Sequence, residues 1–430
     1  MSGGTALTDG PVLPLDDFQR LMHMWSADNP FSGIDAIEYS GHVDVELLRC
    51  AAETELSLLG IGYPAVTADQ CHVQYLSTTP ALAIDVVGPE PSGAASALLA
   101  RKCEAELNQP FAASDALIRL WVVMGEPASY IGMTWQHWPI DGVSAAELFR
   151  RILARFVGKP VPHPSPAVEM LHPDRASIFA PFFTFQRNVR DFFISIREFY
   201  YHSRIFVVPR PATKRTANEV HLLEVPQPAR PHGATLNDVL AAALMWSLAK
   251  ALPDRQQNDW RRWINLINFV DLRPFGGDLL QRAWGSYLGY CSFFMPDPRP
   301  KRFDELIADV QAQSVRIKEG ELFFASLGGF ALLRHAWQWL PNQLHGLPYF
   351  LCPFTAGLTN TRFRSEWNSA SLDPRFGRSW RVAPCAPMAP LVLDVCTKGN
   401  DVSLALTCEA GSYMSDRIDV IKTAMMRVLD

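Results

Sequence analysis

The residues that could do chemistry stand together in one short stretch, residues 137–142, which reads His-Trp-Pro-Ile-Asp-Gly. Histidine is the side chain best suited to act as a general base near neutral pH. Asp141 follows four residues later and is placed to brace the turn, while Gly142 supplies backbone freedom at a chain reversal. This His-x-x-x-Asp-Gly pattern predicts a site that removes a proton, with His137 and Asp141 as candidate catalytic residues and Gly142 as a structural member.

The elements predicted around this stretch would hold it rigidly. Residues 120–124 and 130–136 are apolar and partly β-branched, and a turn cluster separates them, which predicts an antiparallel hairpin that ends at His137. A capping box, with Ser144 as N-cap and Glu147 three residues later, predicts that a helix starts directly afterwards. A side chain at a strand end is firmly held yet accessible, which suits catalysis.

Each of these residues also has a structural interpretation. His137 could be a partly buried histidine within its own loop, although strand end, glycine, aspartate and capped helix together favour catalysis. Asp141 could be a second catalytic carboxylate or an anchor; a carboxylate just before a helix can fix the turn and pair with an arginine, so we favour the anchor. Ser144 is explained better as a cap than as a nucleophile. Because no protein nucleophile is evident, direct transfer from donor to acceptor is simpler than a covalent enzyme intermediate.

Composition narrows the class of protein. The chain has 430 residues, a net charge of −5 and 48% hydrophobic residues, which fits a large globular protein and disfavours nucleic acid as a partner. No apolar run is long enough for a transmembrane segment, and the N-terminus lacks a signal-peptide pattern. The 8 cysteines are scattered, which predicts reduced thiols and a cytoplasmic location. Neither zinc-ligand spacing nor a dinucleotide or phosphate loop is present, so we expect no metal and no cofactor.

Helix and strand signals alternate along the whole chain, which predicts a mixed α/β fold in two halves. The predicted helices are 15–25, 45–58, 92–107, 144–156, 235–251, 303–318, 330–340 and 415–429. The predicted strands outside the hairpin are 37–39, 73–76, 81–87, 264–270, 287–295, 349–358, 391–396 and 402–408.

Two proline-rich linkers, 158–166 and 208–215, flank a segment dense in aromatic residues at 179–206. This segment is predicted to be a long helix packed between two lobes; a membrane-surface helix or an apolar substrate wall is the alternative. The predicted domains are an N-terminal lobe at 1–175, an aromatic bridging helix and linker at 176–215, and a C-terminal lobe at 216–430.

The motif resembles that of the His-x-x-x-Asp-Gly acyltransferases. This superfamily includes chloramphenicol acetyltransferase, the BAHD acyltransferases, the condensation domains of nonribosomal peptide synthetases and polyketide-associated acyltransferases. Further segments resemble the family nearly from end to end: 39–48, 109–119, 267–273 and 349–361. The resemblance implies two chloramphenicol-acetyltransferase-like lobes that form a pseudo-dimer with a central tunnel, in which an acyl thioester and its acceptor meet.

The resemblance also implies roles for individual residues. His137 would take the proton of a hydroxyl or amine acceptor as it attacks the thioester carbonyl, and Asp141 would pair with Arg273 and hold the loop. Thr359 or Asn360 would help to stabilise the oxyanion. Trp138 is a further candidate for positioning the substrate.

The donor implied by the resemblance is acyl-CoA, or the phosphopantetheinyl thioester of an acyl or peptidyl carrier protein. No carrier or adenylation domain accompanies the motif, so we expect a carrier protein to act in trans on a free-standing enzyme. The acceptor would be a small molecule, and no other cofactor is expected.

The chain departs from the family pattern at two places. The usual His-Pro-x-Leu-Arg segment is represented only by residues 54–60, and Arg362 stands where glycine is common. The second BAHD signature, Asp-Phe-Gly-Trp-Gly, is absent, which favours a bacterial-type or condensation-like member. We therefore keep three functions open: an acyltransferase of secondary metabolism that makes an ester or amide, a non-catalytic condensation-like module that docks a carrier protein, and a catalyst of cyclisation or dehydration on a tethered intermediate.

Overall fold

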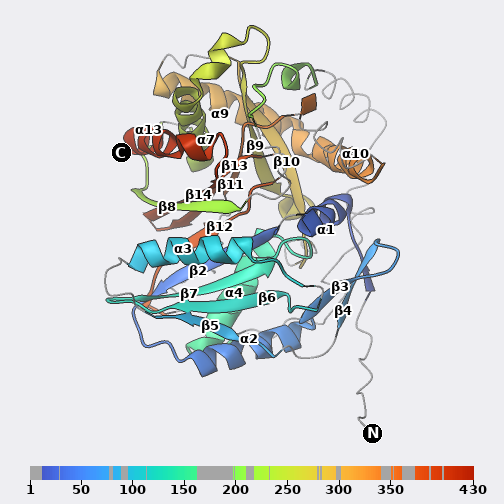
Figure 1. Cartoon of the computed structure of the whole chain (residues 1–430), viewed down its shortest axis with the longest axis vertical. Coiled ribbons are helices and arrows are strands. Elements are labelled where there is room, and N and C mark those ends of the chain that lie inside the picture. The colour runs from blue at the N-terminus through green and yellow to red at the C-terminus, as the bar shows by residue number, and fades with distance from the viewer. Residues whose placement is uncertain are drawn as a thin grey trace. The chain divides into compact units, whose positions relative to one another are not determined.

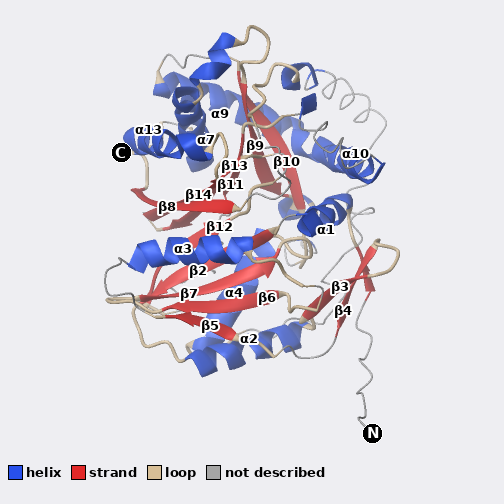
Figure 2. Cartoon of the chain, in the orientation of Figure 1, coloured by secondary structure: helices blue, strands red, loops and turns tan. Residues whose placement is uncertain are grey.

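The structure is a computed structural model, and it assigns the chain to two compact units, each built from separated segments. It describes residues 12–28, 30–76, 81–88, 95–112, 114–161, 197, 199–209, 217–231, 233–277, 280, 283–296, 302–339, 350–351, 353–360, 373–386, 389–399 and 401–430. Unit 1 is formed by Met1–Arg175, Arg273–Tyr287 and Thr361–Arg381, and unit 2 by Ala176–Leu272, Leu288–Asn360 and Val382–Asp430. Both units mix helices and strands, which confirms the predicted α/β class (Figure 2).

Parts of the sequence analysis lie outside the described residues. They include most of the aromatic bridge predicted at 176–215, and also Thr361 and Arg362 of the late motif. The predicted lobes run consecutively along the chain, whereas in the structure residues 273–287 and 373–381 group with unit 1. This grouping matters because both segments deliver an arginine to the surroundings of His137.

Unit 1 holds a five-stranded sheet with the order β12-β2-β7-β6-β5 and a three-stranded sheet with the order β1-β4-β3 (Figure 1). Its strands are β1 (Val12–Pro14), β2 (Ser32–Tyr39), β3 (Tyr63–Val66), β4 (His72–Leu76), β5 (Ile84–Val87), β6 (Ile118–Val123), β7 (Ser129–Gln136) and β12 (Phe376–Val382). Its helices are α1 (Asp17–Asp28), α2 (Val45–Leu59), α3 (Ala95–Asn108) and α4 (Gly142–Phe156), with the 3-10 turn η4 (Arg273–Phe275).

Helices α3 and α4 cover opposite faces of the five-stranded sheet. Successive side chains of a strand point to opposite faces. Thr134 of β7 contacts Glu106 of α3, whereas Tyr39 of β2 packs its ring against Phe156 of α4. Tyr39 lies opposite Ser129 in the β2–β7 ladder, so these two side chains point to the same face of the sheet. Ser129 is an odd number of residues from Thr134, so Thr134 points to the other face. The Tyr39 face is the one that α4 covers. The strand that leads to His137 is thus buried on both sides.

Unit 2 is a six-stranded mixed sheet with the order β10-β9-β11-β13-β14-β8, and helices α7, α9 and α13 pack against it. Its strands are β8 (Asn218–Pro226), β9 (Ile264–Asp271), β10 (Leu288–Met295), β11 (Ala356–Asn360), β13 (Leu391–Lys398) and β14 (Asp401–Glu409). Its helices are α7 (Leu236–Ala251), α9 (Phe303–Gly320), α10 (Ala325–Trp339) and α13 (Ile418–Leu429), with the 3-10 turns η3 (Pro253–Gln257), η5 (Leu322–Phe324) and η8 (Ser415–Arg417).

Most predicted elements are present, and the local signals behind them are visible. Thr235 caps α7 with a full capping box, and the predicted strands at 391–396 and 402–408 are the antiparallel pair of β13 and β14, joined by a turn around Gly399, which has a φ of 59°. The predicted hairpin before His137 is the antiparallel pair of β6 and β7. The strand expected at 349–358 is wrong in its bounds, since residues 350–351 are helical and β11 begins at Ala356.

Candidate active site

His137 directly follows β7, and its imidazole packs against two aromatic rings. Phe31, which precedes β2, stacks on it with ring centroids 5.3 Å apart and planes 27° apart. Trp135 approaches it at 4.8 Å with the planes tilted by 55°. The residue as a whole is partly exposed, and its Nδ1 atom is buried. A reactant that uses this imidazole would therefore have to reach Nε2.

The surroundings of His137 favour the neutral imidazole. Burial lowers the pKa of His137 below 6.5, and the positive charge of Arg381 acts in the same direction. Asp141 and the backbone carbonyls of His137 and Ile140 act against this lowering of the pKa. Nδ1 makes no hydrogen bond in the structure, and proton abstraction would use the tautomer that carries its proton on Nδ1. That tautomer leaves the lone pair on Nε2, as a general base requires.

Asp141 is the N-cap of α4, which begins at Gly142. Its Oδ1 accepts hydrogen bonds from the amides two and three residues ahead, at 3.1 Å and 2.9 Å. The prediction that Ser144 caps this helix is wrong, because the carboxylate takes both first-turn amides and Ser144 lies within the helix. Glu147 forms an ion pair with an arginine three residues on instead of completing a capping box. The helix is therefore anchored by the motif aspartate itself.

Arg273 holds the other side of the Asp141 carboxylate. Its Nη1 donates to Oδ2 at 2.7 Å and its Nη2 to Oδ1 at 3.0 Å, so the pair is bidentate. Both side chains are fully buried, with 0% of Asp141 and 1% of Arg273 exposed. The pairing that the resemblance implied is thus present within unit 1. The remaining donors of Arg273 bond to the Ser144 hydroxyl and to the carbonyls of Ala283 and Gly285.

Residues 283–287 complete the shell around this ion pair. The carbonyl of Gly285 accepts from the Asp141 amide and the Ser144 hydroxyl, and the Tyr287 amide donates to Asp141 Oδ2 at 2.9 Å. Gly285 has a φ of 129°, a conformation that glycine adopts readily and other residues do not. Sequence reasoning missed Gly285, Tyr287 and the role of Ser144, because their contacts join positions more than 100 residues apart. Gly142, by contrast, has no positive φ; its place is the first residue of α4.

This shell keeps Asp141 ionised. Burial alone would raise its pKa, but the Arg273 guanidinium and the amides of Tyr287 and Ser144 outweigh burial and hold the pKa of Asp141 below 3.8. Both carboxylate oxygens of Asp141 accept hydrogen bonds from these donors. Asp141 therefore acts on His137 through the fixed turn and through its negative charge, and the structure favours an anchor over a second proton carrier.

We expect Gly285→Ala to destabilise the protein by about 1–3 kcal/mol, because an L side chain at this φ strains the backbone that carries the shell. Urea unfolding measures the loss. Gly328→Ala in α10 is a matched control, since a Cβ there meets no atom within 4 Å. The control should be neutral or slightly stabilising, because alanine is a better helix former than glycine. Equal stability of the two variants would contradict the role given to Gly285.

The remaining predicted site residues lie in different surroundings. Trp138 is buried, with 6% exposed; its indole N–H donates to Gln136 at 3.0 Å and its ring meets that of His23 edge-on. These contacts give it a packing role, and a part in positioning substrate stays a prediction. Thr359 and Asn360 end β11 in unit 2, both partly exposed. Their predicted part in stabilising an oxyanion also stays a prediction.

Glu55 has a structural role in the segment 54–60, which stands where the family has His-Pro-x-Leu-Arg. It lies in the 54–60 segment, is fully buried, and accepts hydrogen bonds from Arg151 and Arg155, each Nε lying 2.7 Å from a carboxylate oxygen. This ionic contact ties α2 to α4 and so supports the helix that Asp141 caps. A charged residue on the apolar face of the predicted helix 45–58 was the sequence signal for it.

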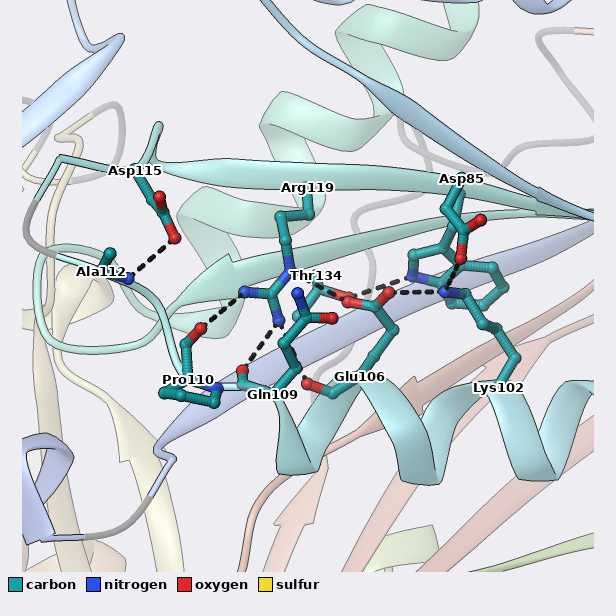
Figure 3. Close-up of polar contacts among 10 residues, drawn as sticks. Asp85, Lys102, Glu106, Gln109, Pro110, Ala112, Asp115, Arg119 and Thr134 are labelled. Atoms are coloured by element: carbon teal, nitrogen blue, oxygen red, sulfur yellow. Dashed lines mark hydrogen bonds and ion pairs between the residues drawn. The ribbon is translucent and has the colours of Figure 1, made fainter.

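A second polar network lies on the α3 face of the same sheet (Figure 3). Glu106 of α3 accepts from Thr134 of β7, from Lys102 and from Arg119, and the indole of Trp121 donates to Thr134 at 3.0 Å. The network anchors β7 to α3 and to β6. None of its members contacts the His137 ring in the part of the chain that is described, so we assign it a structural role.

One cluster of side chains in unit 2 has the composition of a metal site. Glu219, His221 and Cys408 bring one ligand atom each to within 4.8 Å of one another. However, His221 Nε2 lies 2.7 Å from Glu219 Oε1, and Lys422 lies 3.5 Å from His221 Nδ1. A histidine that donates to a carboxylate from Nε2 and faces an ammonium group at Nδ1 has no lone pair for a cation. The arrangement is explained by these hydrogen bonds.

Comparison of the chain with known proteins identifies its fold. No protein-family model and no curated protein matches the chain. Solved structures match it almost throughout. The EpoB NRPS cyclization-docking bidomain from Sorangium cellulosum is 13% identical with a TM-score of 0.66, covering 100% of this chain and 87% of the other. The first condensation domain of the calcium-dependent antibiotic synthetase is 14% identical with a TM-score of 0.66, covering 98% and 96%.

The chain has the condensation-domain fold. Polyketide synthase associated protein 5 from Mycobacterium tuberculosis agrees with this assignment, at 15% identity and a TM-score of 0.61, with 98% of this chain and 99% of the other covered. The resemblance found in the sequence is therefore confirmed at the level of the fold of this superfamily. At such low identity the likeness extends to fold and not to substrate. Among the described residues, no helix combines the length and the apolarity needed to cross a bilayer.

Proposed function

We propose that this condensation-fold protein is an acyltransferase that moves an acyl group from a thioester to an amine or hydroxyl, with His137 as general base. One observation carries the proposal: an imidazole with a lowered pKa stands at the end of a buried strand, on a turn fixed by a buried Asp141–Arg273 pair. General bases need a correctly placed lone pair that is free near the working pH. The lowered pKa and the fixed turn support this role for His137.

The proposed reaction proceeds by addition of the acceptor to the thioester and loss of the thiol. The acceptor nitrogen or oxygen forms a bond to the thioester carbonyl carbon, and its proton moves to His137 Nε2. The resulting oxyanion collapses, the carbon–sulfur bond breaks, and the thiolate leaves with the proton that His137 returns. Asp141 takes no proton; it holds the turn and favours the imidazolium that forms transiently. We also propose Thr359 and Asn360 as oxyanion donors.

The donor in this proposal is acyl-CoA or an acyl or peptidyl carrier protein acting in trans, and the acceptor is a small molecule, as in secondary metabolism. Support comes from the solved structures that share the fold, which include a condensation domain of an antibiotic synthetase and a polyketide synthase associated protein. A cytoplasmic location and the absence of a further cofactor are part of the same proposal.

Intact-mass measurement tests the proposed reaction. The protein is incubated with a panel of acyl-CoA and acyl-carrier donors and with amine and alcohol acceptors. Transfer joins the two substrates, so a product whose mass is their sum less the thiol supports the proposal. Carrier binding without any product, unaffected by His137→Ala, would instead indicate a non-catalytic docking module.

Cyclisation is the second candidate, because a cyclization-docking bidomain shares the fold over the whole of this chain. The same mass measurement separates it from acyl transfer. Cyclisation with dehydration removes one water from a tethered intermediate, whereas simple transfer leaves the acyl group intact on the acceptor.

We also expect kcat/KM to fall at acid pH. A base works only when unprotonated, so kcat/KM should rise with pH and level off once His137 is neutral. Because the pKa of His137 is lowered, the midpoint should lie below 6.5. The pKa of Asp141 is lowered below 3.8, so that group stays ionised across this range and adds no second limb. A midpoint above 6.5 would contradict the neutral imidazole.

A further inference from the structure

A second buried ion pair lies close to His137, on the face of the sheet that α4 covers. Arg381 of β12 donates to Asp35 of β2 from Nε at 2.9 Å and from Nη2 at 2.5 Å, and both side chains are buried. The pair joins two strands that meet only because the late segment 376–382 enters the sheet of unit 1. A buried ion pair is weak evidence for stability, since desolvation offsets the attraction of the charges. Its position suggests another role.

Asp35 is connected to the His137 ring through a single side chain. The indole N–H of Trp135 donates to Asp35 Oδ2 at 3.1 Å, and the same indole packs against the His137 imidazole. Gly33 opposite makes room for the indole, because a Cβ at Gly33 would lie 2.3 Å from it. Phe31 stacks on the imidazole as well. The imidazole thus packs in an aromatic slot formed by Phe31 and Trp135, and the ion pair holds Trp135 through its indole hydrogen bond.

We propose that Asp35, Arg381 and Trp135 are positioning residues, which set the plane of the His137 imidazole so that Nε2 faces the reactants. The inference rests on the proposed function for its catalytic meaning, but the orientation of the ring can be measured without any substrate. Nδ1 makes no hydrogen bond of normal geometry, so the aromatic slot has to supply the orientation that such a bond would otherwise give. Displacement of a reacting group by 1 Å is enough to cost about 100-fold in rate.

The chain offers a matched control on the opposite face of the same sheet. Trp121 also lies over a glycine, Gly132, and its indole N–H also donates into a buried polar network, through Thr134 to Glu106. Figure 3 shows Thr134 and Glu106 in this network, beside the helix that carries Lys102 and Glu106. Trp121→Phe therefore removes the same kind of hydrogen bond from the same sheet without touching the slot.

The first experiment compares Trp135→Phe with Trp121→Phe. Each variant keeps an aromatic ring and loses one indole hydrogen bond, so we expect similar losses of thermal stability. Only Trp135→Phe should shift the imidazole NMR resonances of His137, assigned by their absence in His137→Gln, and should lower kcat by about 10-fold to 100-fold with a nearly unchanged KM for the acceptor. Unchanged His137 resonances and kcat in Trp135→Phe, or equal effects of the two variants, would overturn the proposal.

The second experiment tests the ion pair through Arg381→Gln. The charged groups that act on His137 among the described residues are Asp141, before α4, and Arg381, on β12. Loss of the Arg381 cation should raise the pKa of His137, measured by NMR titration, and move the acid limb of kcat/KM upward together with it. An unchanged or lowered pKa of His137 would contradict a link between the pair and the imidazole.

A double variant that removes both charges of the Asp35–Arg381 pair is less prone to misfold than a variant that removes only one. Asp35→Asn combined with Arg381→Gln retains hydrogen-bonding side chains without leaving one buried charge alone. If this folded variant shows native His137 resonances and native kcat, the charges are not needed for positioning and the proposal falls. If the resonances move as expected but no donor supports turnover even in the unmodified protein, the positioning stands and the proposed function fails.

Discussion

His137→Ala should lower turnover by about 10²–10⁴-fold, the range that loss of a general base produces. The residue as a whole is partly exposed, and its Nδ1 has no hydrogen bond to lose, so the variant should keep its fold. The rings of Phe31 and Trp135 would close part of the space that the imidazole leaves. Steady-state kinetics with the best donor and acceptor, together with thermal unfolding, measures both effects.

His72→Ala is the matched control for this substitution. His72 lies at the start of β4 with 40% of its side chain exposed and pairs with Asp69, so the same atoms are removed from the surface of the same unit. Its turnover should match that of the unmodified protein. Near-normal turnover of His137→Ala would reject proton abstraction by this residue, and equal losses in both variants would point to a defect in folding.

Local signals in the sequence were enough for the core of the site. The hairpin of β6 and β7 and the position of His137 after it follow from an apolar run, a turn cluster and a second apolar run. The pairing of Asp141 with Arg273 came from the resemblance, since a separation of 132 residues carries no periodic signal. The N-cap of α4 was predicted at Ser144, which was wrong. Asp141 and Ser144 can both cap a helix start, and the Asp141 carboxylate binds the first free amides.

The parts that escaped prediction are set by contacts between distant segments. Strand β12 is absent from the predictions, yet it forms the edge of the sheet beside β2 and supplies Arg381. Gly285 resembles any other loop glycine until its φ of 129° and its hydrogen bonds to the motif are known. In the sequence Trp135 is an ordinary apolar residue of a strand, and only the structure shows that its indole N–H bonds to Asp35 and its ring packs against His137.

Breaking the Asp141–Arg273 pair should affect stability and activity together. Asp141→Asn leaves the Arg273 guanidinium buried without its counter-charge, and Arg273→Ala leaves a buried carboxylate alone. Removing one partner of a buried pair typically costs about 3–5 kcal/mol. Because five hydrogen bonds converge on Asp141, the turn that carries His137 should loosen as well, and kcat should fall. Asp304→Asn, which removes an exposed ion pair with Arg302, is the control and should change neither property measurably.

The pH dependence of stability in the same variants distinguishes the contribution of the ionised Asp141 carboxylate from that of its hydrogen-bond geometry. The pKa of Asp141 is lower in the folded protein than in the unfolded chain, so its stabilising contribution is fully present above the unfolded value, near 3.8, and is lost as pH falls through the folded value. The gap in stability between the unmodified protein and Asp141→Asn should therefore narrow on acidification below about pH 4. A gap that stays constant would mean that the lost geometry of the cap, and not the ionised carboxylate, is responsible. Unchanged melting temperatures for both Asp141→Asn and Arg273→Ala at neutral pH would remove the bracing role, and with it the reason why His137 is held in place.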